Sequence, residues 1–150
     1  MPRALKARLK PGLQAEGFRV ALRRAPEAPR LARSRAGALR YEIVRRSDGA
    51  VIGEVKCRGG EPAAGWLTVR DIVVGEGWRG WGYGSEAVWL LEAEAQAERF
   101  RADVEAGNGL ALYFWLRLGY RPGAAGGGAG RAPSRYHLDG PIGRRRLELL

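Results

Sequence analysis

The feature that most constrains this chain is a glycine-dense run, Gly75–Gly84, between two stretches of different periodicity. The stretch before it, Trp66–Val74, is rich in β-branched and aromatic residues and predicts a central strand. The stretch after it, Ser85–Phe100, carries apolar residues at helical spacing and predicts a helix. Glycines let a backbone turn tightly and approach a ligand, and helix N-terminal amides suit a phosphate. The run therefore predicts a strand–loop–helix unit that either turns the chain or cradles a phosphate.

The rest of the chain predicts an α/β domain with one sheet. Further strands are expected at Phe18–Arg24, Leu39–Arg46, Ala50–Arg58, Arg101–Glu105 and Arg135–Leu138. The turn Ser47-Asp48-Gly49 joins two of these strands into a hairpin, since an Asp-Gly pair tolerates the positive dihedral angles of a tight turn. A second helix is expected at Asn108–Leu118, with Gly119 at its C-terminal cap.

Length and composition indicate one domain over residues 1–150, the size of a single core. Three segments lie outside the predicted core: a basic N-terminal arm at 1–17, a flexible glycine-rich loop at 123–134 and a charged C-terminal tail at 140–150. A single cysteine, Cys57, excludes an internal disulfide. We expect a cytoplasmic protein without membrane contact, because the chain shows neither a secretory signal nor an apolar window long enough to cross a bilayer.

The formal net charge of +10 fits either nucleic-acid or anionic-ligand binding, or merely an arginine-rich surface. We favour the surface, because the arginines do not form one stripe interleaved with aromatic residues.

The hexapeptide Arg79-Gly80-Trp81-Gly82-Tyr83-Gly84 lies at the end of the glycine-dense run. It matches neither the dinucleotide motif G-x-G-x-x-G nor the phosphate-binding motif G-x-x-x-x-G-K-S/T, so alone it is weak evidence. Its context, from Trp66 to Tyr120, resembles the GNAT superfamily of acetyl-CoA-dependent N-acetyltransferases. The signature Gln/Arg-x-x-Gly-x-Gly/Ala of that family is met by Arg79, Gly82 and Gly84. A later family stretch, N-x-x-A followed by Y-x-K-L-G-F, is similar at Asn108, Ala111, Arg117, Leu118, Gly119 and Tyr120.

This resemblance implies a mixed, mostly antiparallel sheet flanked by helices, in which two central strands splay apart. It implies acetyl-CoA as co-substrate, with pantetheine in the gap pairing with the backbone of Ile72, Val73 and Val74. The pyrophosphate would lie on the amides of Arg79, Gly80, Trp81, Gly82, Tyr83 and Gly84. Asn108 would contact the pantetheine side, and Trp115 would pack against the cofactor or the core.

The catalytic positions of the family are matched less well. Asp71 lies where some members carry an aspartate that acts as general base, but Arg70 precedes it where they have a glutamate. Trp115 replaces the tyrosine that often protonates the leaving thiolate, and an indole is no acid at neutral pH. Tyr113 falls on roughly the opposite helix face and cannot simply substitute.

Other chemically capable side chains carry weaker signals. Glu54 and Glu105 are expected beside the gap between the splayed strands. His137 is expected on the surface, and Cys57 is expected to be buried and inert. No metal-ligand spacing is found. The Ala25–Ala38 segment is shorter than the two helices that the family places there. An acceptor site that is open to solvent, or one completed by a partner subunit, follows from that difference.

Two functions remain open. The favoured one is acetyl transfer from acetyl-CoA to a primary amine of a small molecule, a protein N-terminus or a lysine, by direct attack in a ternary complex. The alternative is a GNAT-fold CoA-binding or regulatory module that has lost its chemistry, with nucleic acid or the ribosome as a less favoured partner. A homodimer is an open alternative to a monomer.

Overall fold

The computed structural model describes residues 18–25, 37–123 and 134–141. The basic arm at 1–17, most of the glycine-rich loop, nearly all of the charged tail and most of the Ala25–Ala38 segment lie outside these residues. Within the described part of the chain, no helix is long and apolar enough to span a membrane.

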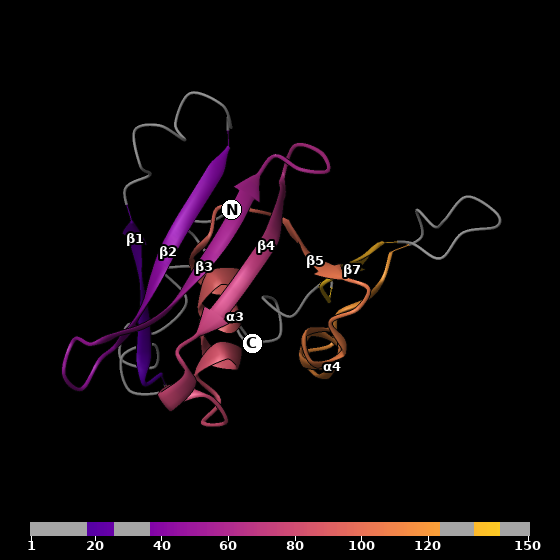
Figure 1. The fold of residues 1–150 in the computed structure, drawn as a ribbon. Helices are drawn as coiled ribbons and strands as arrows, with labels where there is room; N and C mark the ends of the chain where they lie inside the picture. The colour runs from indigo at the N-terminus through magenta and orange to yellow at the C-terminus, as the bar shows by residue number, and fades with distance from the viewer. Residues whose placement is uncertain (1–17, 26–36, 124–133, 142–150) are drawn as a thin grey trace.

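The described residues form one seven-stranded sheet in the order β1-β2-β3-β4-β5-β7-β6 (Figure 1). All neighbouring strands are antiparallel except β4 and β5, which are parallel. The predicted mixed, mostly antiparallel sheet is therefore confirmed. The strands are β1 (Val20–Ala25), β2 (Ala38–Arg45), β3 (Val51–Gly59), β4 (Trp66–Val74), β5 (Arg99–Glu105), β6 (Arg121–Pro122) and β7 (Arg135–Asp139).

In the described segments, two α-helices and one short 3-10 helix connect the strands. The 3-10 helix η1 (Glu76–Trp78) and helix α3 (Tyr83–Glu94) follow β4, and helix α4 (Gly109–Arg117) follows β5. Figure 1 shows α3 lying against one face of the sheet, behind β3 and β4. The core forms at this face, where buried α3 residues meet buried strand residues: Ala87, Val88 and Leu91 against Val20, Ile43, Val55 and Val69.

Helix α3 ends earlier than the predicted Ser85–Phe100. Its last residue is Glu94, and Phe100 belongs to β5, where it lies opposite Leu67 of β4. A crossover between parallel strands must return the chain to the sheet, and here Gly65 O accepts from Glu98 N at 2.8 Å. Phe100 is the first of three alternate β5 residues that are buried in the core, followed by Ala102 and Val104.

The two predicted turns have the expected glycine conformations. Gly49, in the β2–β3 hairpin, has φ 75°, and Gly119, after α4, has φ 90°. Hydrogen bonds from Arg45, together with that from the backbone N–H of Ala50, hold the pKa of the Asp48 carboxyl at about 2. The hairpin is therefore fastened by an ion pair as well as by its turn.

Candidate functional site

The parallel strands β4 and β5 pair only at their first residues. The pairing runs from Trp66, opposite Arg99, to Val69, opposite Ala102. Beyond Ala102, the described residues of β5 make no further pairs with β4, while the pairing of β5 with β7 on the other side runs on to Glu105. Among the described strands, the remaining half of β4 pairs with β3 alone, so its other edge faces a gap in the middle of the sheet. The predicted splay of the central strands is therefore present.

A bulge lies in β4 where the gap opens. Cys57 of β3 lies opposite Val69, but the preceding Lys56 lies opposite Asp71, so Arg70 is an extra residue. An extra residue changes which face the following side chains occupy. Asp71 therefore shares the outer face with Lys56, whereas Ile72, opposite the buried Val55, points toward the core.

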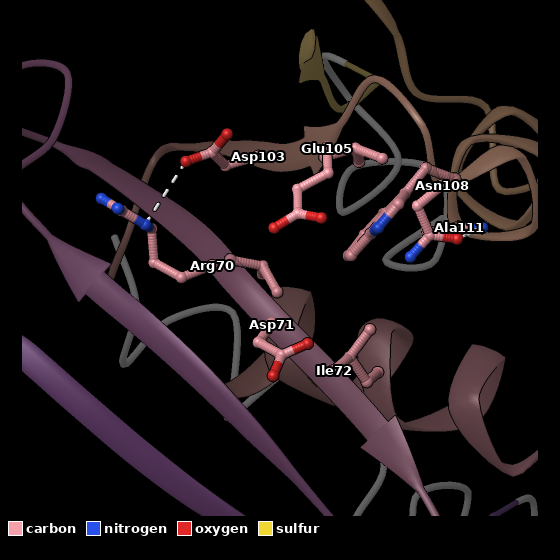
Figure 2. A pocket seen from close by; sticks show the side chains of 10 residues that line it. Arg70, Asp71, Ile72, Asp103, Glu105, Asn108 and Ala111 are labelled. Atoms are coloured by element: carbon pink, nitrogen blue, oxygen red, sulfur yellow. Dashed lines mark hydrogen bonds and ion pairs between the residues drawn. The ribbon is translucent and has the colours of Figure 1, made fainter. Parts of the chain in front are cut away.

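The gap holds a first cavity of about 370 Å³. Figure 2 shows its wall built from β4 on one side, with Asp71 and Ile72, and from β5 and α4 on the other, with Glu105 and Asn108. Asn108 caps the N-terminus of α4, where its Oδ1 accepts from Ala111 N at 3.0 Å. Asx side chains favour this position because the first helical amides lack partners. The cap fixes Asn108 at the mouth of the cavity.

The carboxylates of the first cavity differ in their partners. The buried Asp103 accepts a hydrogen bond from Arg135 Nε at 2.6 Å and forms an ion pair with Arg70 Nε at 3.3 Å. The hydrogen bond to Asp103 raises the pKa of Arg135. Glu105 lies 3.5 Å from Arg135 Nη1. In the described part of the chain, no ion pair or hydrogen bond engages the exposed Asp71 carboxylate. Asp71 is therefore the carboxylate of this cavity that no described side chain engages, so its oxygens are accessible to a substrate.

A second cavity of about 310 Å³ lies at the glycine loop, around the start of α3. Two arginines, Arg79 and Arg117, line it, and no acidic residue among those described does. Arg79 Nε donates to Val74 O at 2.8 Å, which ties the loop to the end of β4. The other lining residues are Val74, Trp78, Gly80, Gly82, Tyr83, Gly84, Ser85 and Phe114.

The loop needs glycine at two positions. Gly80 has φ 82° and Gly82 has φ 85°, and an L side chain is strained in that region. Gly82 is the N-cap of α3, so the free amides of the first helical turn open toward this cavity. Free amides, a helix N-terminus and two arginines together suit an anion such as a phosphate group.

Most of the predicted site residues line one of the two cavities. The first cavity is lined by Asp71, Ile72, Asn108 and Trp115, and the second is lined by Val74, Arg79, Gly80, Gly82, Tyr83 and Gly84. Neither cavity is lined by Val73, whose side chain lies opposite Glu54 on the outer face, or by Trp81, which is 63% exposed.

Trp115 is 3% exposed and packs against the rings of Phe114 and Tyr120, with centroids 5.2 and 4.7 Å away. It is thus a core side chain that also borders the first cavity.

The other candidates of the sequence lie away from the first cavity, apart from Glu105. Glu54 is paired with Arg40 and Lys56. Tyr113 is 60% exposed, with Arg117 over its ring. Burial raises the pKa of the Cys57 thiol to about 12, which keeps it protonated and inert. No group of three or more potential metal ligands occurs among the residues described.

Several lining residues were missed in the sequence, among them Phe114, Arg117 and Asp103. Phe114 and Arg117 lie on the same side of α4 because they are three residues apart, and Phe114 Cε2 would lie 3.4 Å from a Cβ on Gly84. Counting this spacing from Asn108 would have suggested them. No sequence pattern pointed to Asp103 beyond the alternation of β5, since its arginine partners lie on the neighbouring strands β4 and β7, far from it in the sequence.

Comparisons with known proteins agree with this geometry. Residues 13–120 match the model of a family described as the acetyltransferase (GNAT) family. No protein with curated function matches the sequence.

Three solved structures have similar folds. An acetyltransferase from Thermus thermophilus has a TM-score of 0.63 at 20% identity, covering 75% of this chain and 70% of its own. A GNAT family acetyltransferase from Elizabethkingia anophelis, with acetyl-CoA bound, has a TM-score of 0.58 at 12% identity, covering 81% and 97%. Naa50 from Arabidopsis thaliana, in complex with the bisubstrate analogue CoA-Ac-MVNAL, has a TM-score of 0.57 at 14% identity, covering 83% and 99%. At these identities the similarity concerns the fold.

Proposed function

The chain belongs to the acetyltransferase (GNAT) family, and we propose that it transfers the acetyl group of acetyl-CoA to a primary amine within a ternary complex. The observation that carries this proposal is the position of the two cavities along one strand. The first is lined by Asp71 and the second by Val74, three residues further along β4. This arrangement would put a phosphate-binding site and a proton acceptor on the same short segment of backbone, which supports the proposal.

The gap in the sheet supports a specific place for acetyl-CoA. The gap-facing edge of Ile72, Val73 and Val74 has no strand partner among the described residues. Backbone polar groups need hydrogen-bond partners when they are shielded from water, and the amides of an extended pantetheine arm can supply them. The pyrophosphate would then lie on the loop amides from Arg79 to Gly84, and Asn108 would face the pantetheine.

The proposed chemistry is direct attack of the amine on the thioester. An ammonium must first lose a proton, and Asp71 accepts it directly or through a water. The amine nitrogen forms a bond to the acetyl carbon and gives up a second proton to water. The carbon–sulfur bond breaks, and CoA leaves as a thiolate that water protonates. Positioning of both substrates and backbone N–H groups near the carbonyl oxygen supply the rest of the rate enhancement.

The acceptor is proposed as a class only: an amine of a small molecule, a protein N-terminus or a lysine. The Arabidopsis Naa50 structure contains the analogue CoA-Ac-MVNAL, which supports including short peptides with free N-termini among the acceptors tested.

The test is a thiol-release assay with acetyl-CoA and a panel of amines, peptides and aminoglycosides. We expect turnover with at least one acceptor, and we expect Asp71→Asn to lower kcat ~100-fold with little change in the KM for acetyl-CoA. Glu54→Gln is the matched control, since this carboxylate is also on the outer face but does not line the first cavity.

The same assay distinguishes the alternative function. CoA binding without turnover on any acceptor would favour the binding module that has lost its chemistry. Full activity of Asp71→Asn would remove Asp71 from the mechanism while leaving acetyl transfer in place.

A further inference from the structure

Arg19, just before β1, contacts the start of α3 although the two are far apart in sequence. Its backbone N donates to Glu86 Oε1 at 2.6 Å, and its Nε donates to Glu86 Oε2 at 2.7 Å. Its Nη2 also pairs with Glu86 Oε2 and donates to the carbonyl oxygen of Trp81 at 2.6 Å. The guanidinium lies over the ring of Tyr83, 4.5 Å from its centroid. One side chain thus binds three residues of the loop and helix.

Glu86 is an unusual neighbour for a phosphate site. It lies in the first turn of α3 and is only 7% exposed. A carboxylate there stabilises the helix dipole, but it also repels a pyrophosphate that binds the same helix N-terminus. A buried carboxylate without a partner is costly. Arg19 satisfies both oxygens of Glu86 and cancels its charge.

The bond to Trp81 fixes the shape of the loop. The residues on either side of Trp81, Gly80 and Gly82, are the loop residues with positive φ. Because they carry no side chains, they cannot fix the loop conformation through side-chain contacts. A trans peptide is planar, and its N–H points opposite to its C=O. Holding the Trp81 oxygen toward Arg19 therefore aims the N–H of Gly82 away from Arg19, and Gly82 lines the second cavity.

A second arginine holds the other end of the loop. Arg45 lies over the ring of Trp78, 4.2 Å from its centroid, and this indole meets Tyr83 edge-on at 6.4 Å. The two arginine–aromatic contacts clamp the segment between η1 and α3. Only the Arg19 contact, however, also reaches the carbonyl of the loop and the carboxylate of the helix.

We propose that Arg19 and Glu86 are positioning residues for acetyl-CoA: they set the direction of the loop amides and remove a negative charge beside the pyrophosphate. This inference rests on the proposed function, because it requires that the second cavity binds the pyrophosphate. Neither residue lines that cavity, so both act through the loop.

The experiment measures CoA binding by calorimetry in the full chain and in four variants, the fourth being the double variant Arg19→Ala/Glu86→Gln. Arg19→Ala should weaken CoA binding roughly tenfold, since it removes charge-assisted hydrogen bonds and leaves Glu86 uncompensated. Arg19→Lys should weaken it less, because the charge remains while the fork geometry is lost. Arg23→Ala is the control: this arginine is also half exposed and pairs with a glutamate, Glu42 at 3.2 Å, away from the loop.

Steady-state kinetics separate a positioning role from a loss of folding. Arg19→Ala should raise the KM for acetyl-CoA about tenfold with kcat unchanged. It should leave kcat/KM for acetylpantetheine, which has no pyrophosphate, within about twofold. A merely destabilised protein would lose both co-substrates equally and would show a lower thermal midpoint for each. The double variant Arg19→Ala/Glu86→Gln should recover part of the affinity, because it removes the uncompensated carboxylate.

Three results would overturn the inference. If Arg19→Ala bound CoA as tightly as the unaltered protein, the inference would be refuted and the proposed function would stand. Equal losses with acetyl-CoA and acetylpantetheine would have the same consequence. Absence of CoA binding by the unaltered protein would refute the proposed function and this inference together.

Discussion

Asn108 serves two purposes that substitution can separate. Its Oδ1 caps α4 through Ala111 N at 3.0 Å, and the residue also lines the first cavity. Its side-chain NH2 group is therefore left for a ligand in that cavity. Asn108→Ala removes both groups. Asn108→Asp keeps the acceptor oxygen that caps the helix but replaces the NH2 donor with an oxygen.

The two variants should differ in stability. An Asn cap replaced by alanine costs about 1 kcal/mol, which lowers the thermal midpoint of a chain of this size by about 2–4 °C. Asn108→Asp should keep the midpoint or raise it slightly, since a carboxylate at a helix N-terminus interacts well with the dipole. Calorimetric unfolding of the three proteins at neutral pH measures both effects.

Their effect on the co-substrate should be similar. If the NH2 group donates to pantetheine, both variants lose one neutral hydrogen bond, about 1 kcal/mol, and the KM for acetyl-CoA rises about fivefold. An unchanged midpoint for Asn108→Ala would refute the capping argument. An unchanged KM for Asn108→Asp would refute the role of Asn108 toward acetyl-CoA, whatever the midpoints are.

Three further perturbations test other parts of the structure. Gly53→Ala would place a Cβ 2.2 Å from the carbonyl oxygen of Val73, so we expect a loss of about 2–3 kcal/mol in urea unfolding, and wild-type stability would contradict the β3–β4 register. Cys57, with a thiol pKa raised to about 12, should resist thiol reagents at pH 8 until the protein unfolds, and rapid labelling of the native protein would show that the thiol is not buried. The stability that the buried neutral thiol contributes is complete below the ordinary thiol pKa and is lost as the pH rises toward 12. Tyr113→Phe should keep kcat within about twofold, because this exposed ring lines neither cavity, and a large loss would make it the acid that protonates the thiolate.

The local parts of the fold were predictable because they depend on local chemistry. The bounds of the strand Trp66–Val74 follow from its β-branched run, and the hairpin follows from Asp48-Gly49. Phe100 was misassigned because an apolar residue just beyond a helix fits either the last turn of that helix or the first residue of a strand. Periodicity over so few residues does not separate the two.

The non-local parts of the site were not predictable from patterns. The bulge at Arg70 is a property of the β3–β4 register, which sequence spacing does not reveal. The contact between Arg19 and Glu86 joins residues 67 positions apart. The first depends on how β3 and β4 pair, and the second on how the start of β1 packs against α3.

The short pairing of β4 with β5 has a mechanical consequence. Four opposed residue pairs hold the part of the sheet with β1–β4 to the part with β5–β7, which is fewer than at any other seam of the described strands except that of the two-residue edge strand β6. We expect each side of the seam to behave as its own cooperative unit in native-state hydrogen exchange, with amides of β5 and β7 opening at lower free energy than those of β3. A molecule that lies along the open edge of β4 and touches α4 would bridge the seam. Its binding would make the two units open together, and the free energy of opening would rise with its concentration.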